Sequence, residues 1–280
     1  MAVLFAVSCG DSPNRPGPVP NAPPPPPPPV NNSAPSISSI TLQGTKQNEP
    51  PNYSDVGETV AVSAAVTDAE SNVDSLQYNW TATLGTFTGT GARVSWVAPA
   101  TATTPVTVTI TLEVVERFGT NQENRVSKTA TLALHDNSKE VGDMASRFLA
   151  EFSKPQTNKN WQDIMRDFKA SACPDPREID NERNDVVNHY TNFFMNDYRI
   201  DPPRVTTNFG GTCPRANAKG DACAAVGVRW NSTNTTTKVT ATTVGIDHVS
   251  AAFSTADNRW WLCSSYFEPT TSLGHSFYLR

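Results

Sequence analysis

The side chains singled out as candidates for proton transfer are histidines and aspartates in the C-terminal half of the chain. The candidates are His189, Asp201 and His248, together with Asp247, which immediately precedes His248 in a strand-like segment. General acid–base catalysis needs both groups within reach of one substrate, whereas neighbouring residues of a strand point to opposite faces. Asp247 and His248 could therefore share a pocket only across a bulge. We predict that the protein is not an enzyme, with an enzyme using these residues as the alternative.

One acidic turn offers hard oxygen ligands of the kind that Ca²⁺ prefers. It contains Asp68, Glu70 and Asp74, but it lacks a denser Asp-Gly-Asp pattern. We therefore expect an ordinary solvated turn, with a calcium site as the alternative. The histidines are far apart, and neither C-x-x-C nor a phosphate-loop motif occurs. No cofactor is predicted.

The N-terminal residues resemble the end of a bacterial lipoprotein signal. An apolar run leads into Ala6-Val7-Ser8-Cys9, which is similar to a lipobox. The resemblance implies that residues 1–8 are the remnant of a signal peptide and that Cys9 carries a lipid. Gly10 follows instead of Asp, which by the same resemblance implies the outer membrane in a two-membrane bacterium. The run lacks a preceding Lys or Arg and is short for a signal, so a chance apolar N-terminus is the alternative.

The next segment is rich in proline. Eleven of the 23 prolines lie in the first 29 residues, seven of them consecutively in Pro23–Pro29. Such a composition buries too little apolar surface to fold, and the proline run favours polyproline II. We interpret residues 9–35 as a lipidated cysteine and a disordered tether that holds the rest of the chain off a membrane. A ligand for a proline-recognising domain is the alternative.

Residues 36–136 show strand-like alternation without a helical pattern. Apolar side chains occupy every second position in Val60–Val66 and again in Val106–Val114, which indicates half-buried strands of a β-sandwich. The steps Tyr78-Asn79-Trp80 and Ser95-Trp96-Val97-Ala98-Pro99 resemble the bacterial immunoglobulin-like and polycystic-kidney-disease (PKD) repeat group. The resemblance implies a spacer or an adhesive platform, with Trp80 as the buried core indole.

Residues 139–269 begin with helical stripes and continue with strands, which indicates an α+β arrangement. The helical stripes are Val141–Phe152, Trp161–Phe168 and Val186–Phe194, and the strand-like segments are Val205–Phe209, Val226–Trp230, Val239–Phe253 and Trp260–Phe267. This layout resembles the cone-shaped fold of the nuclear transport factor two-like superfamily, which implies a pocket between helices and sheet. A cystatin-like fold is the alternative on the same grounds. We assign residues 270–280 to a C-terminal tail.

The cysteines fit this scheme. If Cys9 is lipidated, four cysteines remain, and all of them lie within residues 139–269. An even number of cysteines in an exported domain predicts disulfides. Four cysteines allow three pairings. Cys213 and Cys223 flank a polar loop, so we predict Cys213–Cys223 and Cys173–Cys263. Four free thiols are the alternative.

Two adjacent tryptophans stand in the last strand-like segment. We expect Trp260 to point into the core and Trp261 to lie on the opposite face. An exposed Trp261 could serve as a platform for a sugar. Carbohydrate adhesion through this residue is therefore a further alternative.

Charge and hydropathy exclude several classes of protein. The net charge is −5, from 22 basic and 27 acidic residues without a block of like charge, so a nucleic-acid partner is not expected. No apolar run reaches the roughly 18–20 residues of a membrane span, so a polytopic membrane protein is excluded.

We predict a multidomain chain, with an all-β immunoglobulin-like sandwich followed by an α+β domain of three helices packed on a curved antiparallel sheet. The predicted function is a lipid-anchored envelope protein, on the outer membrane or cell surface, that acts as a non-catalytic binding or structural module for a protein or glycan.

Overall fold

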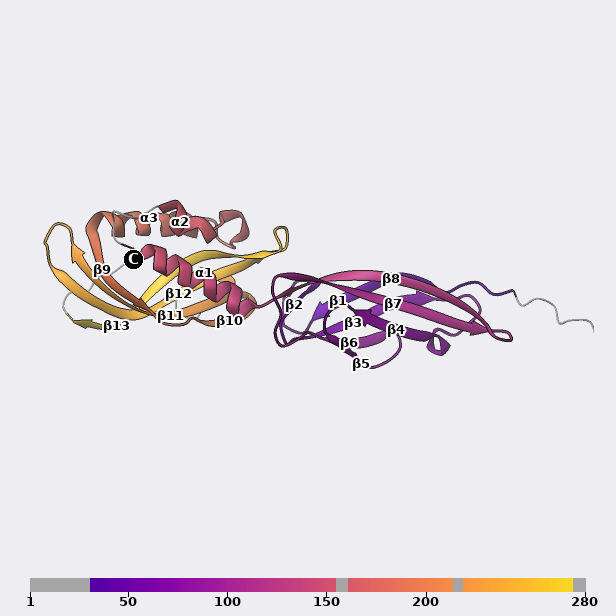
Figure 1. Ribbon diagram of the computed structural model, residues 1–280. Coiled ribbons are helices and arrows are strands. Elements are labelled where there is room, and N and C mark those ends of the chain that lie inside the picture. The colour runs from indigo at the N-terminus through magenta and orange to yellow at the C-terminus, as the bar shows by residue number, and fades with distance from the viewer. Residues whose placement is uncertain (1–30, 155–160, 214–218, 274–280) are drawn as a thin grey trace, which may run out of the picture. The chain divides into compact units, whose positions relative to one another are not determined.

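The computed structural model describes residues 31–154, 161–213 and 219–273, and it is mostly β-structure arranged in three sheets (Figure 1). Cys9 and most of the proline-rich segment lie outside the described residues, as does the end of the predicted tail. From Ser33 onward the described residues belong to one compact unit. None of its helices is both long and apolar enough to cross a bilayer.

Residues 36–135 form two four-stranded sheets. The first runs in the order β1-β3-β6-β5, with β1 Ser36–Gly44, β3 Thr59–Thr67, β6 Arg93–Val97 and β5 Thr86–Thr88. The second runs in the order β2-β8-β7-β4, with β2 Tyr53–Asp55, β8 Gln122–His135, β7 Val106–Phe118 and β4 Gln77–Ala82. A short 3₁₀ helix, η1 Val73–Ser75, precedes β4. Neighbouring strands are antiparallel except β2 and β8, which are parallel. The three-residue strand β2 is too short to show a periodic signal in the sequence.

The core of this part differs from the prediction at one aromatic residue. Trp96 is fully buried and donates its indole N–H to the carbonyl of Leu84 at 2.9 Å, whereas Trp80 is only half-buried. The expectation that Trp80 is the buried core indole is therefore wrong. Its strand β4 is the edge of its sheet, while β6, which carries Trp96, has a neighbour on each side.

The rest of the described chain combines helices with one five-stranded sheet. The helical elements are α1 Asn137–Phe152, α2 Trp161–Ile164, η3 Met165–Asp167, η4 Ala170–Ala172 and α3 Arg177–Asn192. The strands are β9 Phe193–Ile200, β10 Arg204–Thr212, β11 Lys219–Asn234, β12 Thr240–Ser254 and β13 Arg259–Leu273. The sheet order is β10-β11-β12-β13, and β9 pairs with the other half of β11. Helices α1 and α3 lie on the same side of the sheet (Figure 1).

Helix α1 forms where the sequence predicts it. The carboxylate of Asp136 accepts the N–H of Lys139 at 2.9 Å and caps the first turn. One face, from Val141 through Phe148 to Phe152, is buried and packs on the sheet. Because this face supplies apolar side chains at each turn, α1 becomes the helical wall of the main hydrophobic core.

The other helical predictions need correction at their ends. The helix expected over Trp161–Phe168 is a four-residue α2 followed by the 3₁₀ turn η3. The helix expected to reach Phe194 ends at Asn192, because Phe193 opens β9 and pairs there with Asn234 of β11. At the C-terminus, β13 continues to Leu273, beyond the expected boundary at 269.

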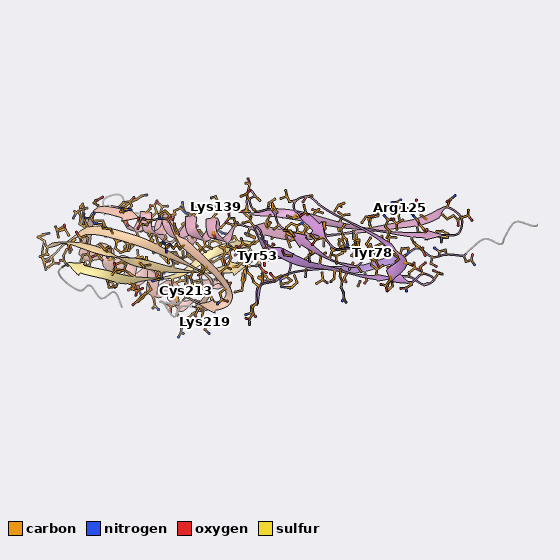
Figure 2. The ribbon with its side chains drawn as sticks, turned by 90° about the horizontal axis from the view of Figure 1, so that it is seen from below. Tyr53, Tyr78, Arg125, Lys139, Cys213 and Lys219 are labelled. Carbon is orange, nitrogen blue, oxygen red and sulfur yellow. A yellow bond between two sulfur atoms is a disulfide. The ribbon has the colours of Figure 1, made fainter. Side chains whose placement is uncertain are left out.

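Tyr53 of β2 belongs to the same hydrophobic core as the helices and the five-stranded sheet. Its hydroxyl donates a hydrogen bond to the side-chain carbonyl of Asn137, which also accepts the indole N–H of Trp260 at 3.1 Å. The ring of His135 stacks on Tyr53 at a centroid distance of 5.1 Å. Burial raises the pKa of Tyr53 far above its usual range, so the phenol stays neutral. Packing thus crosses the boundary that the sequence places between residues 136 and 139. Figure 2 labels Tyr53 among the side chains.

Candidate functional site

A cavity of about 460 Å³ lies between helices α1 and α3 and strands β11, β12 and β13. Its volume is within the range of small-molecule sites. Its apolar wall comes from Phe148, Leu149, Phe152, Val186, Trp230 and Phe267, and its polar wall includes Glu178, Glu182, Asp185 and Asp247. Both kinds of surface meet in one hollow, so the cavity could hold a molecule with an apolar body and a polar head.

Glu182 is a buried carboxyl group on helix α3. It accepts two hydrogen bonds from Ser265 of β13, the backbone N–H at 2.8 Å and the hydroxyl at 2.9 Å. Among the described strands β13 is the edge of the sheet, so this N–H is available to a side chain of α3. Burial, and the negative charge of Asp247, raise the pKa of Glu182 to about 8, although the two bonds from Ser265 oppose the shift.

Asp247 is the second buried carboxyl group. It lies on β12, opposite Val226 of β11 and Phe267 of β13, and its residue is only 4 % exposed. Its Oδ1 atom has no hydrogen-bond partner among the described residues. Burial raises the pKa of Asp247 to about 7. An acceptor that is buried and unpaired costs about 1–3 kcal/mol in a folded protein.

His189 lines the same cavity at the end of α3. Its ring stacks on Phe193 at a centroid distance of 5.1 Å and packs against Phe152 at 4.6 Å. On the facing strand, Trp230 lies 5.1 Å from Phe267 and donates its indole N–H to the hydroxyl of Ser153 at 2.7 Å. These rings form an aromatic wall beside the carboxyl groups.

The other two acid–base candidates lie elsewhere. His248 points to the opposite face of β12 from Asp247, and its Nε2 lies 3.1 Å from a carboxylate oxygen of Glu268. Asp201 is exposed and pairs with Arg199 at 3.1 Å. Of the histidine and aspartate candidates named from the sequence, the cavity thus brings together only His189 and Asp247.

Sequence reasoning missed Glu182, although a signal for it exists. Ile179 and Val186 are buried three residues before and four residues after it, so Glu182 falls on the apolar stripe of α3. A carboxyl group at such a position must be buried with partners or mark a site. The prediction placed the start of this helical pattern at Val186, one turn too late to include Glu182.

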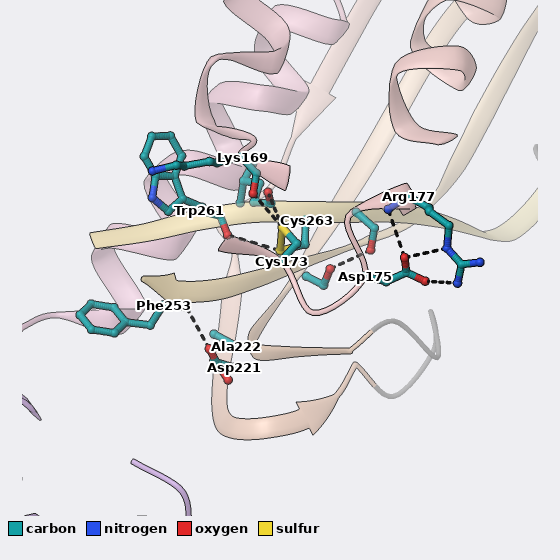
Figure 3. Close-up of a disulfide and its surroundings, with 12 residues drawn as sticks. Lys169, Cys173, Asp175, Arg177, Asp221, Ala222, Phe253, Trp261 and Cys263 are labelled. Carbon is teal, nitrogen blue, oxygen red and sulfur yellow. Dashed lines mark hydrogen bonds and ion pairs between the residues drawn. A yellow bond between two sulfur atoms is a disulfide. The ribbon is translucent and has the colours of Figure 1, made fainter. Parts of the chain in front are cut away.

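Two cations lie over the ring of Trp261, and Figure 3 labels one of them, Lys169. The guanidinium carbon of Arg259 lies 3.9 Å from the ring centroid, and the Lys169 ammonium lies 5.1 Å from it. The indole N–H donates to Asp257 at 3.0 Å, and the side chain is half-buried. Trp260 is 1 % exposed and lies in the core. The platform face needed for a sugar is thus partly occupied by the protein's own cations.

The described residues contain two disulfides, Cys173–Cys263 and Cys213–Cys223, and these are the two pairs that the sequence predicts. The first joins the segment before α3 to β13 (Figure 3), and the second closes the ends of β10 and β11. Since α3 and β13 both line the cavity, the first disulfide fastens two of its walls together.

In the acidic turn named as a calcium candidate, hydrogen bonds hold Glu70 and one oxygen of Asp68, whereas Oδ2 of Asp68 is buried without a partner among the described residues. Asp68 accepts the N–H groups of Glu70 and Ser71 at 3.0 and 2.6 Å, and Glu70 accepts the hydroxyl of Ser33 at 3.2 Å. The third candidate, Asp74, lies in η1, where its N–H is bound by the side chain of Asn72. In the part of the chain that the structure describes, no group of three or more His, Cys, Asp or Glu side chains could hold a metal ion.

Comparisons with known proteins give no family for this chain. No family model, curated protein or solved structure matches it. The case for a function therefore rests on the cavity and on the N-terminal sequence pattern.

Proposed function

We propose that this protein is an exported bacterial lipoprotein whose C-terminal part binds a small ligand in the cavity between α1, α3 and the sheet. Cys9 carries the anchor, and residues 10–35 form the tether. Residues 36–136 are an immunoglobulin-like or PKD-like spacer, and residues 139–269 are a cone-like α+β binding domain. The order of two four-stranded sheets before the helices and the five-stranded sheet is consistent with this division.

The unpaired Oδ1 of Asp247 is the observation that carries the binding proposal. Asp247 lines a cavity large enough for a small molecule, and its enclosed Oδ1 atom accepts no hydrogen bond from a described residue. Buried polar atoms are nearly always hydrogen-bonded. A ligand that donates to Asp247 would remove the cost of leaving it unpaired, and that gain would contribute to affinity.

Binding without catalysis fits the arrangement of the other polar groups. Both carboxylate oxygens of Glu182 already accept hydrogen bonds from Ser265. His248 faces away from Asp247, and the ring of His189 is packed against aromatic neighbours. Asp247 is thus the group best placed to meet a ligand, without an adjacent histidine to complete a proton relay.

Two neighbouring valines of α3 provide a matched test. Val186 is buried and lines the cavity, whereas Val187 is 48 % exposed and does not line it. A chemically mixed library of cations, neutral polyols and anions would be screened by thermal shift on the full chain. Compounds that stabilise the wild type should lose their effect in Val186→Trp and keep it in Val187→Trp.

Two outcomes count against the binding proposal. One is a library without a stabilising compound, and the other is a set of compounds that stabilise Val186→Trp as much as the wild type. If Val186→Trp fails to fold, Asn184→Trp tests the same idea at an exposed lining position of the cavity.

The anchor has a separate test. Mass spectrometry of the membrane fraction should find an acylated Cys9, and Cys9→Ser should release the protein from the membrane. A protein that stays membrane-bound after this substitution would contradict the lipoprotein assignment and leave the cavity proposal untouched.

A second candidate function is an enzyme that uses Asp247 and Glu182 as acid and base. The pKa values of about 7 and 8 favour it, because groups that titrate near neutral pH exchange protons readily. Incubation of each stabilising compound with the protein, followed by NMR, separates the two functions. A binding protein returns the compound unchanged, whereas an enzyme converts it.

A further inference from the structure

Four carboxyl groups and no fixed cation line the cavity among the described residues. Glu178, Glu182 and Asp185 of α3 line it together with Asp247 of β12, and no Lys or Arg among the described residues does so. His189 is the only basic side chain in the described lining, and α1, β11 and β13 add no charged group to it. Carboxylates removed from water need a counter-charge or a proton. The described part of the protein supplies no fixed cation here.

Aromatic rings line the cavity beside these carboxyl groups. Trp230 is 5.7 Å from Phe152 and 5.1 Å from Phe267 by ring centroids, so three rings form a continuous surface. Aromatic faces attract organic cations as well as apolar groups. A molecule with an ammonium head and an apolar body would be matched by both walls.

Other occupants fit less well. A bare metal ion needs several oxygen, nitrogen or sulfur ligands gathered around it, and no such group exists among the described residues. An anion would meet four acidic side chains. A neutral alcohol could donate to Asp247, but it would form no ion pair with the carboxyl groups.

We infer that the cavity takes a small organic cation, a protonated amine whose N–H groups donate to Asp247 and whose body packs on Trp230, Phe152 and Phe267. This inference rests on the proposed binding function and specifies its ligand class. Because the pKa values of Glu182 and Asp247 are raised, the pair holds protons near neutral pH when the cavity lacks a cation. A bound cation favours the ionised carboxylates, so binding releases protons to the solvent.

Three compounds of nearly the same shape test the inference. They are 2-phenylethylammonium, 2-phenylethanol and phenylacetate, which carry a positive, a neutral and a negative head on one aromatic body. Isothermal titration calorimetry on the full chain at pH 7 should give a Kd for the ammonium compound at least about tenfold below that of the alcohol, a difference of about 1.4 kcal/mol. Phenylacetate should bind more weakly than either. Repeating the titration in buffers of different ionisation enthalpy should show proton release for the ammonium compound alone.

Two isosteric variants test whether binding of the ammonium compound depends on the carboxyl group of Asp247. Asp247→Asn removes the charge without changing the shape of the side chain, and it should weaken binding of the ammonium compound at least about tenfold. Asp180→Asn is the control, because Asp180 lies on the same helix as Glu182 but is exposed and outside the cavity lining. It should leave the Kd unchanged within about twofold, which is about 0.4 kcal/mol.

The outcomes separate this inference from the proposed function. Equal or tighter binding of the alcohol or of phenylacetate would overturn the cation class while keeping a ligand-binding cavity. Failure of all three compounds up to about 10 mM, with cavity-dependent stabilisation by neutral or anionic library members alone, would also overturn only the cation class. Failure of the three compounds and of the whole library would overturn both. Loss of binding in Asp180→Asn equal to that in Asp247→Asn would show that the effect does not arise in the cavity.

Discussion

Replacement of Asp247 by asparagine should change how the stability of the protein depends on pH. The folded state raises the pKa of this carboxyl group from 3.8 to about 7 because the group is buried. Between about pH 4 and pH 7 the folded protein therefore holds a proton that the unfolded chain has released. The free energy of unfolding must fall as pH rises through this window, since the unfolded state binds fewer protons.

The magnitude follows from the two pKa values. A tenfold change in the acid dissociation constant corresponds to about 1.4 kcal/mol, so the shift from 3.8 to about 7 amounts to at most about 4 kcal/mol. The asparagine side chain does not titrate in this range, so the variant lacks this contribution. The stability of Asp247→Asn relative to the wild type should thus increase by up to about 4 kcal/mol between pH 4 and pH 8. The full value is an upper bound, because relaxation of the surroundings lowers the cost of ionising a buried group.

Urea unfolding with intact disulfides, followed by tryptophan fluorescence at several pH values, measures this difference. Far-UV circular dichroism on the same samples checks that both signals report one transition. Asp180→Asn serves again as the control, since its exposed carboxyl group should give a pH profile parallel to that of the wild type. Parallel profiles for Asp247→Asn and the wild type would refute the reasoning, because they would mean that Asp247 titrates alike in the folded and unfolded states.

Further predictions concern the disulfides and the core around Tyr53. The cysteines of the Cys173–Cys263 disulfide are 90 residues apart, and replacing both with serine should lower the free energy of unfolding by about 5 kcal/mol. The cysteines of the Cys213–Cys223 disulfide are 10 residues apart, and the same replacement there should lower it by about 3 kcal/mol. Denaturant titrations should rank the two variants in this order, and a larger loss for the shorter loop would contradict the chain-entropy account. Tyr53→Phe should cost about 1 kcal/mol through its lost hydrogen bond. Tyr53→Ala should cost about 3–5 kcal/mol and split one calorimetric transition into two, whereas a single transition in the alanine variant would show that the core does not couple through Tyr53.

The sequence anticipated elements whose residues repeat a strong pattern. The alternation in Val106–Val114 became β7, and the stripe of Val141–Phe152 became α1. Both patterns are long, and both are set by burial on one face, which local sequence records directly.

Elements that depend on distant partners were harder to foresee. Strand β2 has three residues and exists because it pairs with β8, about 80 residues later in the chain. Phe193 continues the apolar stripe of α3, yet it joins β9 because β11 offers it a partner in Asn234. Trp80 and Trp96 are the same residue type in strand-like segments. Only the position of each strand within its sheet decides which side chain is fully buried.

The candidate site was foreseen only in part. The resemblance in layout implied a pocket between helices and sheet, and Asp247 was named as an acid. Its partner Glu182 was not, because the predicted helical pattern began at Val186 and left out the first turns of α3, in which Glu182 follows the buried Ile179. Their meeting depends on how α3 packs over β13, which is a long-range property of the fold.

Formation of the Cys173–Cys263 disulfide would affect how tightly the cavity binds a ligand. It joins the chain just before α3 to β13, so oxidation removes freedom from the helix that carries Glu182 relative to the strand that carries Ser265. A ligand that binds the oxidised protein has less motion left to suppress and therefore keeps more of its contact energy as affinity. In the reduced chain the same ligand would have to order that wall itself. Thiol oxidation would then act as a maturation step, after which the protein is ready to bind without further rearrangement.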